Sequence, residues 1–202
     1  MSLLRTLSIF RNILAIAALF SLQSTASALN VSGVQYDDSI DLRGSKLQLN
    51  GAGIRYKAVF KVYTAGLYLG KKAATPQEVS SQAGSKRISI TMLREIDAAE
   101  LGKLFTRAVE DNIPRAESIR IISPMLRMSQ MFSEYKTLNP GDTFTIDWIP
   151  GAGTIITIKG KTFGEPFKEP EFFNALASIW LGKSPADWQL KEAMLGQKRP
   201  AN

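Results

Sequence analysis

The stretch from Asn50 to Gly70, NGAGIRYKAVFKVYTAGLYLG, constrains this chain most, because it combines strand-forming residues with one arginine and several glycines. Its aliphatic, aromatic and β-branched residues favour a pair of largely buried strands. Arg55 lies among them, and a guanidinium is costly to bury unless an anion accompanies it. Gly51 and Gly53 lead into the arginine and indicate a tight turn or a close backbone approach. We therefore predict a functional site at Arg55, with a solvated arginine at a strand end as the structural alternative.

Residues 1–28 have the pattern of a secretory signal peptide. Arg5 and Arg11 form a basic region, an apolar run extends from Ile13 to Leu22, and Ala26-Ser27-Ala28 is an A-x-A cleavage site. The apolar run is too short to span a membrane, although an uncleaved interfacial anchor is the alternative. Cleavage after Ala28 predicts a periplasmic or secreted protein, in which residues 29–202 form one domain.

Composition excludes several classes of chemistry. The chain has no cysteine and no histidine, so serine–histidine and cysteine nucleophiles, thiolate ligands and histidine-containing metal sites are all absent. We expect no metal and no cofactor. The net charge is +7, but lysine and arginine are scattered along the chain, which does not predict nucleic-acid binding. Contact with an anionic membrane surface remains open, and so does the oligomeric state.

Periodicity along the chain predicts an α+β domain with an antiparallel sheet that helices cover on one face. Residues 86–93 and 143–159 alternate as strands do, and the second segment reads as a hairpin. Helices are expected from Asp97, with Leu101, Leu104, Phe105 and Ala108 facing the core, from 170 to 181, and after Asp187. A further helix is expected from 116 to about 131, which Pro124 should divide or kink. Residues 30–44 are expected to be irregular.

Four segments carry a resemblance to a known family: GAGIR with KVYTAGLYL, RISITML, LNPGDTFTIDWIPGAGTIITI, and ASIWLGKSPADWQLKEAM. They resemble the chalcone isomerase-like superfamily, which includes plant chalcone isomerases, plastid fatty-acid-binding relatives and secreted bacterial members. The resemblance extends over nearly all of residues 29–202. It implies the open-faced sandwich of the chalcone isomerase fold, with a ligand cleft between the sheet and the helices.

In the fatty-acid-binding branch, the resemblance implies that Arg55 and Tyr63 hold the ligand carboxylate. A guanidinium can grip a carboxylate through two hydrogen bonds, and a phenol can donate a third. A cleft lined by the sheet and the helix from Phe172 to Trp180 would then take the acyl tail. Each buried methylene would contribute about 0.8 kcal/mol.

In true chalcone isomerases, the same arginine acts with a threonine that matches Thr64, and with a tyrosine and an asparagine on the following helix. This chain has Glu100 or Leu101 near the position of the tyrosine, and Arg107 or Ala108 near that of the asparagine. Both are departures from the family pattern. Ser178 matches a further hydroxyl position only loosely, and a serine on a helix surface is its structural alternative.

Three hypotheses follow from these residues. The favoured one is a non-catalytic binder of an apolar carboxylate such as a fatty acid, using Arg55 and Tyr63 with Thr64 beside them. The alternative is an isomerase of the intramolecular lyase class, with Arg55 and Thr64 as catalytic residues. The third is an envelope interaction protein whose cleft is vestigial. The departures at the tyrosine and asparagine positions favour binding over catalysis.

Overall fold

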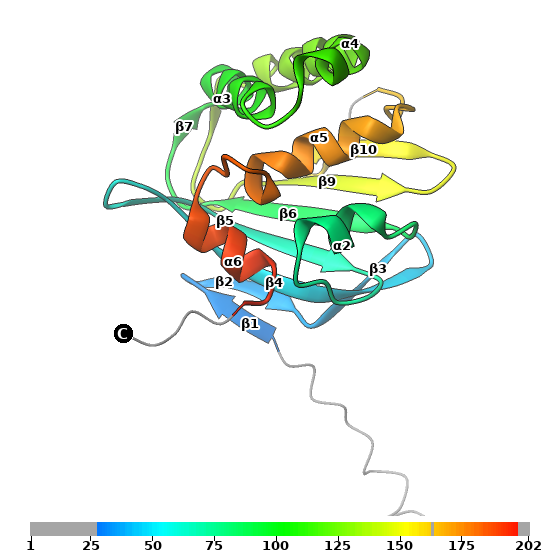
Figure 1. The fold of residues 1–202 in the computed structure, drawn as a ribbon. Coiled ribbons are helices and arrows are strands. Elements are labelled where there is room, and N and C mark those ends of the chain that lie inside the picture. The colour runs from blue at the N-terminus through cyan, green and yellow to red at the C-terminus, as the bar shows by residue number, and fades with distance from the viewer. Residues whose placement is uncertain (1–27, 163, 198–202) are drawn as a thin grey trace, which may run out of the picture.

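The computed structural model describes residues 28–162 and 164–197 (Figure 1). Apart from Ala28, the predicted signal peptide lies outside these residues. The described chain forms eleven strands: β1 (Ala28–Val31), β2 (Val34–Asp37), β3 (Ser39–Leu42), β4 (Ser45–Lys57), β5 (Phe60–Leu69), β6 (Lys86–Met92), β7 (Ile96–Asp97), β8 (Thr137–Leu138), β9 (Thr143–Ile149), β10 (Gly153–Ile158) and β11 (Lys161–Thr162). Its five helices are α2 (Pro76–Ser81), α3 (Ala98–Glu110), α4 (Arg115–Ser133), α5 (Pro170–Leu181) and α6 (Trp188–Met194).

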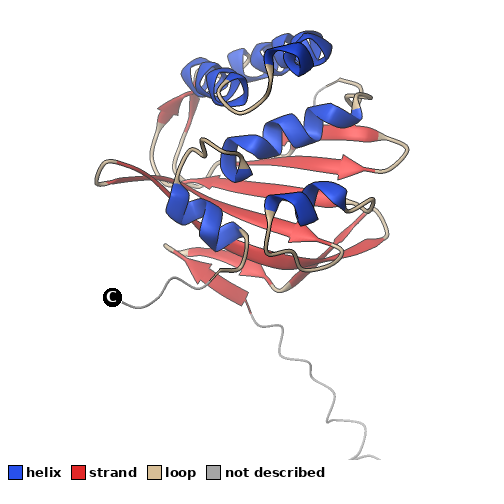
Figure 2. Cartoon of the chain, viewed as in Figure 1, coloured by secondary structure: helices blue, strands red, loops and turns tan. Residues whose placement is uncertain are grey.

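Seven strands form one antiparallel sheet in the order β11-β10-β9-β6-β5-β4-β3. Helices α2, α5 and α6 lie over one face of this sheet, and α3 and α4 run side by side next to α5 (Figures 1 and 2). The β1–β2 hairpin packs against the other face, where Tyr36 joins a small apolar cluster that includes Leu49 and Tyr68. The α+β class and the helix-covered antiparallel sheet are thus confirmed.

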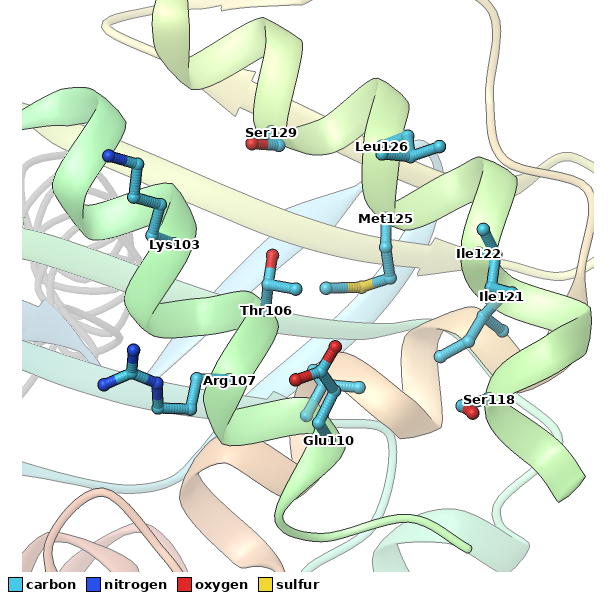
Figure 3. A pocket seen from close by; sticks show the side chains of 11 residues that line it. Lys103, Thr106, Arg107, Glu110, Ser118, Ile121, Ile122, Met125, Leu126 and Ser129 are labelled. Carbon is cyan, nitrogen blue, oxygen red and sulfur yellow. The ribbon is translucent and has the colours of Figure 1, made fainter. Parts of the chain in front are cut away.

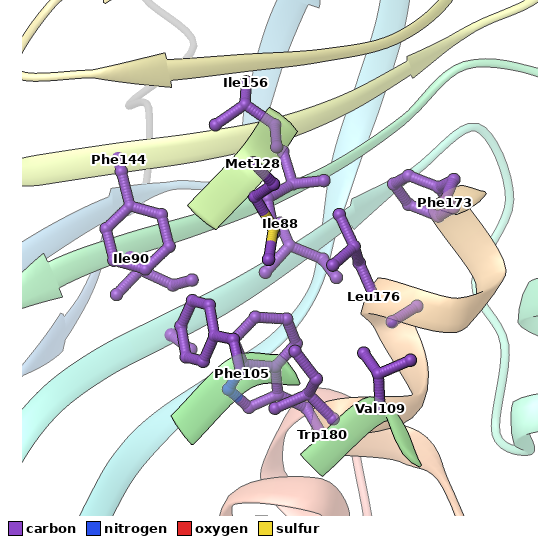
Figure 4. Close-up of a cluster of buried hydrophobic side chains, with 14 of the residues drawn as sticks. Ile88, Ile90, Phe105, Val109, Met128, Phe144, Ile156, Phe173, Leu176 and Trp180 are labelled. Atoms are coloured by element: carbon purple, nitrogen blue, oxygen red, sulfur yellow. The ribbon is translucent and has the colours of Figure 1, made fainter. Parts of the chain in front are cut away.

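The main core fills the space between the sheet and the helices (Figure 4). Its centre is aromatic: the ring of Phe105 on α3 lies 5.5 Å from that of Trp180 on α5, and 5.8 Å from that of Phe132 on α4. Both pairs meet edge to face, an arrangement that ring quadrupoles favour. Strands β6 and β9 complete this core with Ile88, Ile90 and Phe144 among others.

Side-chain caps mark the first residues of two helices. The Thr75 hydroxyl accepts a hydrogen bond from the Glu78 N–H at 3.2 Å and begins α2, and the Asp97 carboxylate accepts from the Glu100 N–H at 2.8 Å and begins α3. Each cap satisfies a backbone donor that lacks a partner within its helix. Pro114 separates α3 from α4.

Two expectations were wrong, and a third was wrong in part. Residues 30–44 contain strands β1 to β3, because two tight turns with positive φ at Ser32-Gly33 and Arg43-Gly44 fold this segment back on itself. Leu104 is exposed, since the core-facing stripe of α3 uses Leu101 and Phe105 instead. Pro124 does not divide the predicted helix, because α4 continues through it from 115 to 133.

Candidate functional site

Arg55 and Tyr63 lie side by side on the face of the sheet that the helices cover. They are directly paired in the β4–β5 ladder, and paired residues of antiparallel strands project to the same face. The structure therefore brings together the two residues that the resemblance assigns to carboxylate binding. Arg55 is 24% exposed, so its guanidinium is neither fully solvated nor fully buried.

Two glycines allow α6 to pack closely over β4 beside this pair. A Cβ atom at Gly51 would overlap the Ala193 carbonyl oxygen, and one at Gly53 would lie 2.7 Å from the Ala193 side chain. Both contacts are too short for a side chain, so the predicted close backbone approach is confirmed. Because α6 lies so close, the residue that precedes it reaches the Arg55 guanidinium.

That residue is Asp187, whose carboxylate accepts hydrogen bonds from three backbone N–H groups. Its Oδ1 accepts from Gln189 and Leu190 at 2.8 and 3.1 Å, which caps α6. Its Oδ2 accepts from the Tyr56 N–H at 2.9 Å and lies 4.0 Å from Arg55 Nη1. The last separation is too long for a hydrogen bond. Sequence patterns predict Asp187 as a cap, but they carry no signal that pairs it with an arginine 132 positions earlier.

Tyr63 is 4% exposed, and its hydroxyl oxygen accepts a hydrogen bond from Trp180 Nε1 at 2.9 Å. Burial raises the pKa of Tyr63 to about 12, although Trp180 and the positive charge of Arg55 act in the opposite direction. The phenol is therefore neutral near pH 7. The Trp180 bond does not use the phenolic proton, so Tyr63 retains a donor next to the guanidinium.

Thr64 is not part of this arrangement. It is fully buried on the opposite face of the sheet, where its hydroxyl accepts a hydrogen bond from the Tyr36 hydroxyl at 2.8 Å. Successive residues of a strand project to opposite faces, so Thr64 cannot share the face of Tyr63. The structure therefore does not form the arginine–threonine pair of the isomerase hypothesis.

The other positions tied to the isomerase pattern are also structural or solvated. Glu100 and Arg107 are exposed on α3, and Leu101 is part of the core. The Ser178 hydroxyl donates to the Ala175 carbonyl oxygen within its own helix at 2.6 Å. None of these side chains supplies the tyrosine or asparagine function that the family pattern requires.

The cleft expected against α5 is filled by side chains. Five residues of its apolar face are at most 1% exposed: Phe172, Phe173, Leu176, Ile179 and Trp180. They belong to the main core, so the α5 face is packing surface in this structure. This corrects the expectation that the face lines an open cavity.

An open groove of about 490 Å³ lies instead between α3 and α4 (Figure 3). Apolar side chains line it, including Val109, Ile121 and Met125, while Lys103 and Arg107 stand on its α3 side. Arg55 and Tyr63 are not among its lining residues. This groove was not predicted, because the sequence of α4 indicates a helix but not which of its faces lacks a partner.

Two features are absent from residues 28–162 and 164–197. No group of three or more aspartate, glutamate, cysteine or histidine residues there could hold a metal ion. None of the helices in the same ranges is long and apolar enough to cross a membrane.

Comparisons with known proteins agree with this fold. The sequence profile of the family described as chalcone isomerase-like matches residues 28–196, and the chain belongs to that family. The structure is similar to the crystal structure of a fatty-acid binding protein of Arabidopsis thaliana, with a TM-score of 0.64 and 17% sequence identity. The match covers 84% of this chain and 96% of the plant chain. No curated protein matches the sequence.

Proposed function

We propose that the protein binds an apolar carboxylate such as a fatty acid, and that Arg55 and Tyr63 hold the carboxylate group. One observation carries the proposal: a partly exposed guanidinium and a buried, neutral phenol occupy paired positions on the same face of the sheet. Membership of the chalcone isomerase-like family and the shared fold with a plant fatty-acid binding protein support a binding role.

The contacts of Asp187 leave Arg55 able to accept a second anion. Because Oδ2 is 2.9 Å from the Tyr56 N–H and Oδ1 caps α6, the carboxylate is held in place by the backbone. Its 4.0 Å separation from Arg55 Nη1 gives attraction without a hydrogen bond. A ligand carboxylate could therefore form the short, charge-assisted hydrogen bonds that Asp187 does not form.

The acyl tail would enter the core beside Trp180, the side chain that contacts Tyr63 directly. Opening this packing would cost about 3–5 kcal/mol, the usual loss when a large aromatic side chain leaves a core. Burial of each methylene returns about 0.8 kcal/mol. A tail of about four to six methylenes is thus needed to offset the cost, so the site should select long chains over short ones.

Lipid extraction and mass spectrometry of the purified protein test the proposal. Co-purified fatty acid should be present in the wild type and lost in Arg55→Ala, and it should be reduced in Tyr63→Phe, which keeps the ring but removes the donor. Arg120→Ala is the matched control, because Arg120 is an exposed arginine whose nearest acidic partner is Glu171 at 3.4 Å. Equal lipid content in the Arg55→Ala and Arg120→Ala proteins would refute Arg55 as the anchor.

We also propose that this binding takes place outside the cytoplasm, after cleavage near Ala28. The support is the signal-peptide pattern of residues 1–28. The intact mass of protein purified from the periplasm or medium should correspond to residues 29–202. A mass that includes the first 28 residues would contradict cleavage.

A further inference from the structure

Apart from Leu29 on β1, the exposed large apolar side chains in the described part of the chain gather at two places. Leu104, Ile119, Ile122 and Leu126 lie on the α3–α4 pair. Val59 and Phe60 lie at the β4–β5 turn and are 82% and 58% exposed. Trp188 is the first residue of α6 and is 60% exposed. Single exposed apolar residues are common, whereas a group that includes two aromatic rings points to a partner.

The second group protrudes at one end of the sheet. The β4–β5 turn reverses at Ala58, whose φ of 52° is in the left-handed region, and the hairpin extends beyond the neighbouring strands (Figure 1). Trp188 lies at the same end, because Asp187 next to it accepts the Tyr56 N–H at 2.9 Å, and Tyr56 is two residues before the turn. Val59, Phe60 and Trp188 therefore lie at the same end of the sheet, and we call this group the apolar tip.

Positive side chains surround the apolar tip. Lys57 and Lys61 flank the turn, and the Arg94 guanidinium lies 5.1 Å from the centre of the Phe60 ring. Lys191 Nζ lies 4.9 Å from the centre of the Trp188 ring. Among the nearby acidic residues, Glu95 follows Arg94 in the chain, and Asp187 faces Arg55. The local charge is therefore positive.

We propose that the apolar tip is a docking surface for an anionic lipid bilayer. Tryptophan and phenylalanine suit the boundary between headgroups and acyl chains, and each nearby lysine or arginine strengthens partitioning about fivefold on an anionic surface. A protruding shape with a cationic border can insert among headgroups, whereas a protein partner would need a hollow to receive it. The α3–α4 groove differs in both respects, since it is concave and carries Glu110 beside Lys103 and Arg107.

Docking through this tip would place Arg55 next to the bilayer surface, because only Tyr56 and Lys57 separate it from the Ala58 turn. The inference does not depend on the proposed ligand. A protein that has lost its fatty acid through Arg55→Ala should still bind vesicles, so the failure of one proposal can be distinguished from the failure of the other.

Co-sedimentation with vesicles of phosphatidylcholine, with and without phosphatidylglycerol, tests the inference. The wild-type protein should bind the anionic vesicles, and added salt should release it. Val59→Ser/Phe60→Ser should weaken partitioning at least about tenfold, the effect of withdrawing one large side chain from the apolar phase. Ile119→Ser/Leu126→Ser on α4 is the matched control and should leave binding unchanged.

Trp188 provides an independent readout. Its fluorescence should shift to shorter wavelength when the protein meets anionic vesicles. Trp188→Phe should abolish that shift, because Trp180 is fully buried and Trp148 lies beside Lys86 at the Leu69 end of the sheet, opposite the Phe60 end. The proposal would be overturned if the wild type bound neutral and anionic vesicles equally, or if it bound neither. It would also be overturned if Ile119→Ser/Leu126→Ser lost binding while Val59→Ser/Phe60→Ser kept it.

Discussion

Asp187→Asn should destabilise the protein and at the same time strengthen fatty-acid binding. Asparagine caps helices as well as aspartate does, so the two bonds from α6 to Oδ1 survive the change. An amide NH₂ group replaces Oδ2 and faces the Tyr56 N–H, so the hydrogen bond between them is lost and two donors are left opposite each other. The attraction between Asp187 and Arg55 is lost as well.

The loss of stability should be about 2 kcal/mol. A hydrogen bond to a charged acceptor contributes about 1.5–3 kcal/mol, and an ion pair at 4.0 Å with a 24% exposed arginine adds less than about 1 kcal/mol. For a domain of this size, the melting temperature should fall by about 4–8 °C. Thermal unfolding followed by circular dichroism measures this fall.

Affinity for a fatty acid such as dodecanoate should rise about fivefold in the same variant. A bound carboxylate and the Asp187 carboxylate compete for one guanidinium and repel each other, and solvent reduces this penalty to about 1 kcal/mol. Isothermal titration measures the affinity. Asp97→Asn is the matched control, because Asp97 caps α3 through the Glu100 N–H at 2.8 Å. Unchanged or weaker binding in Asp187→Asn would refute the view that Asp187 and the ligand share Arg55.

Three further predictions concern packing, pH and chain length. Gly51→Ala should lower the free energy of unfolding by at least about 2 kcal/mol in chemical denaturation, because the new Cβ would overlap the Ala193 carbonyl oxygen and push α6 away. Gly70→Ala, at an open position, should lower it by less than about 1 kcal/mol. Equal losses in the two variants would show that α6 does not pack closely at Gly51. Stability should fall as the pH rises from about 10 to 12, because burial raises the pKa of Tyr63 to about 12 while the unfolded phenol titrates near 10. Denaturant midpoints measured across this range should fall less in Tyr63→Phe than in the wild type. An identical pH dependence in the two proteins would contradict the burial of that phenol. Butanoate should not bind detectably whereas dodecanoate should, as judged by titration, and similar affinities would rule out a tail buried beside Trp180.

Sequence patterns predicted the central elements because their signals are long or chemically specific. Strand β6 alternates over seven residues with every second side chain buried, and Asp97 marks the start of α3. Strands β1 to β3 have four residues each and bury few side chains, so alternation cannot be distinguished from chance there. The Ser32-Gly33 and Arg43-Gly44 pairs, both with positive φ, were the signal that could have revealed these hairpins.

Part of the candidate site could likewise be predicted from local sequence patterns, and part depends on tertiary contacts. Arg55 and Tyr63 could be placed on one face as soon as β4 and β5 were taken as a hairpin, but the turn register decides which residues pair, and one step would have placed Thr64 there instead. The packing of α5 and the position of Asp187 depend on contacts between segments more than a hundred residues apart. No pattern within either segment encodes them.

The geometry of Asp187 explains how Arg55 can be paired and still reactive toward a ligand. A carboxylate free to move would close on the guanidinium to hydrogen-bond distance, and a ligand would then have to break that pair. Asp187 cannot close, because the Tyr56 N–H holds Oδ2 at 2.9 Å and two N–H groups of α6 hold Oδ1. The position of α6 is set in turn by Gly51 and Gly53, which admit its backbone against β4. The two glycines before Arg55 therefore determine how strongly its charge is neutralised, and a substitution at either should change ligand affinity as well as stability.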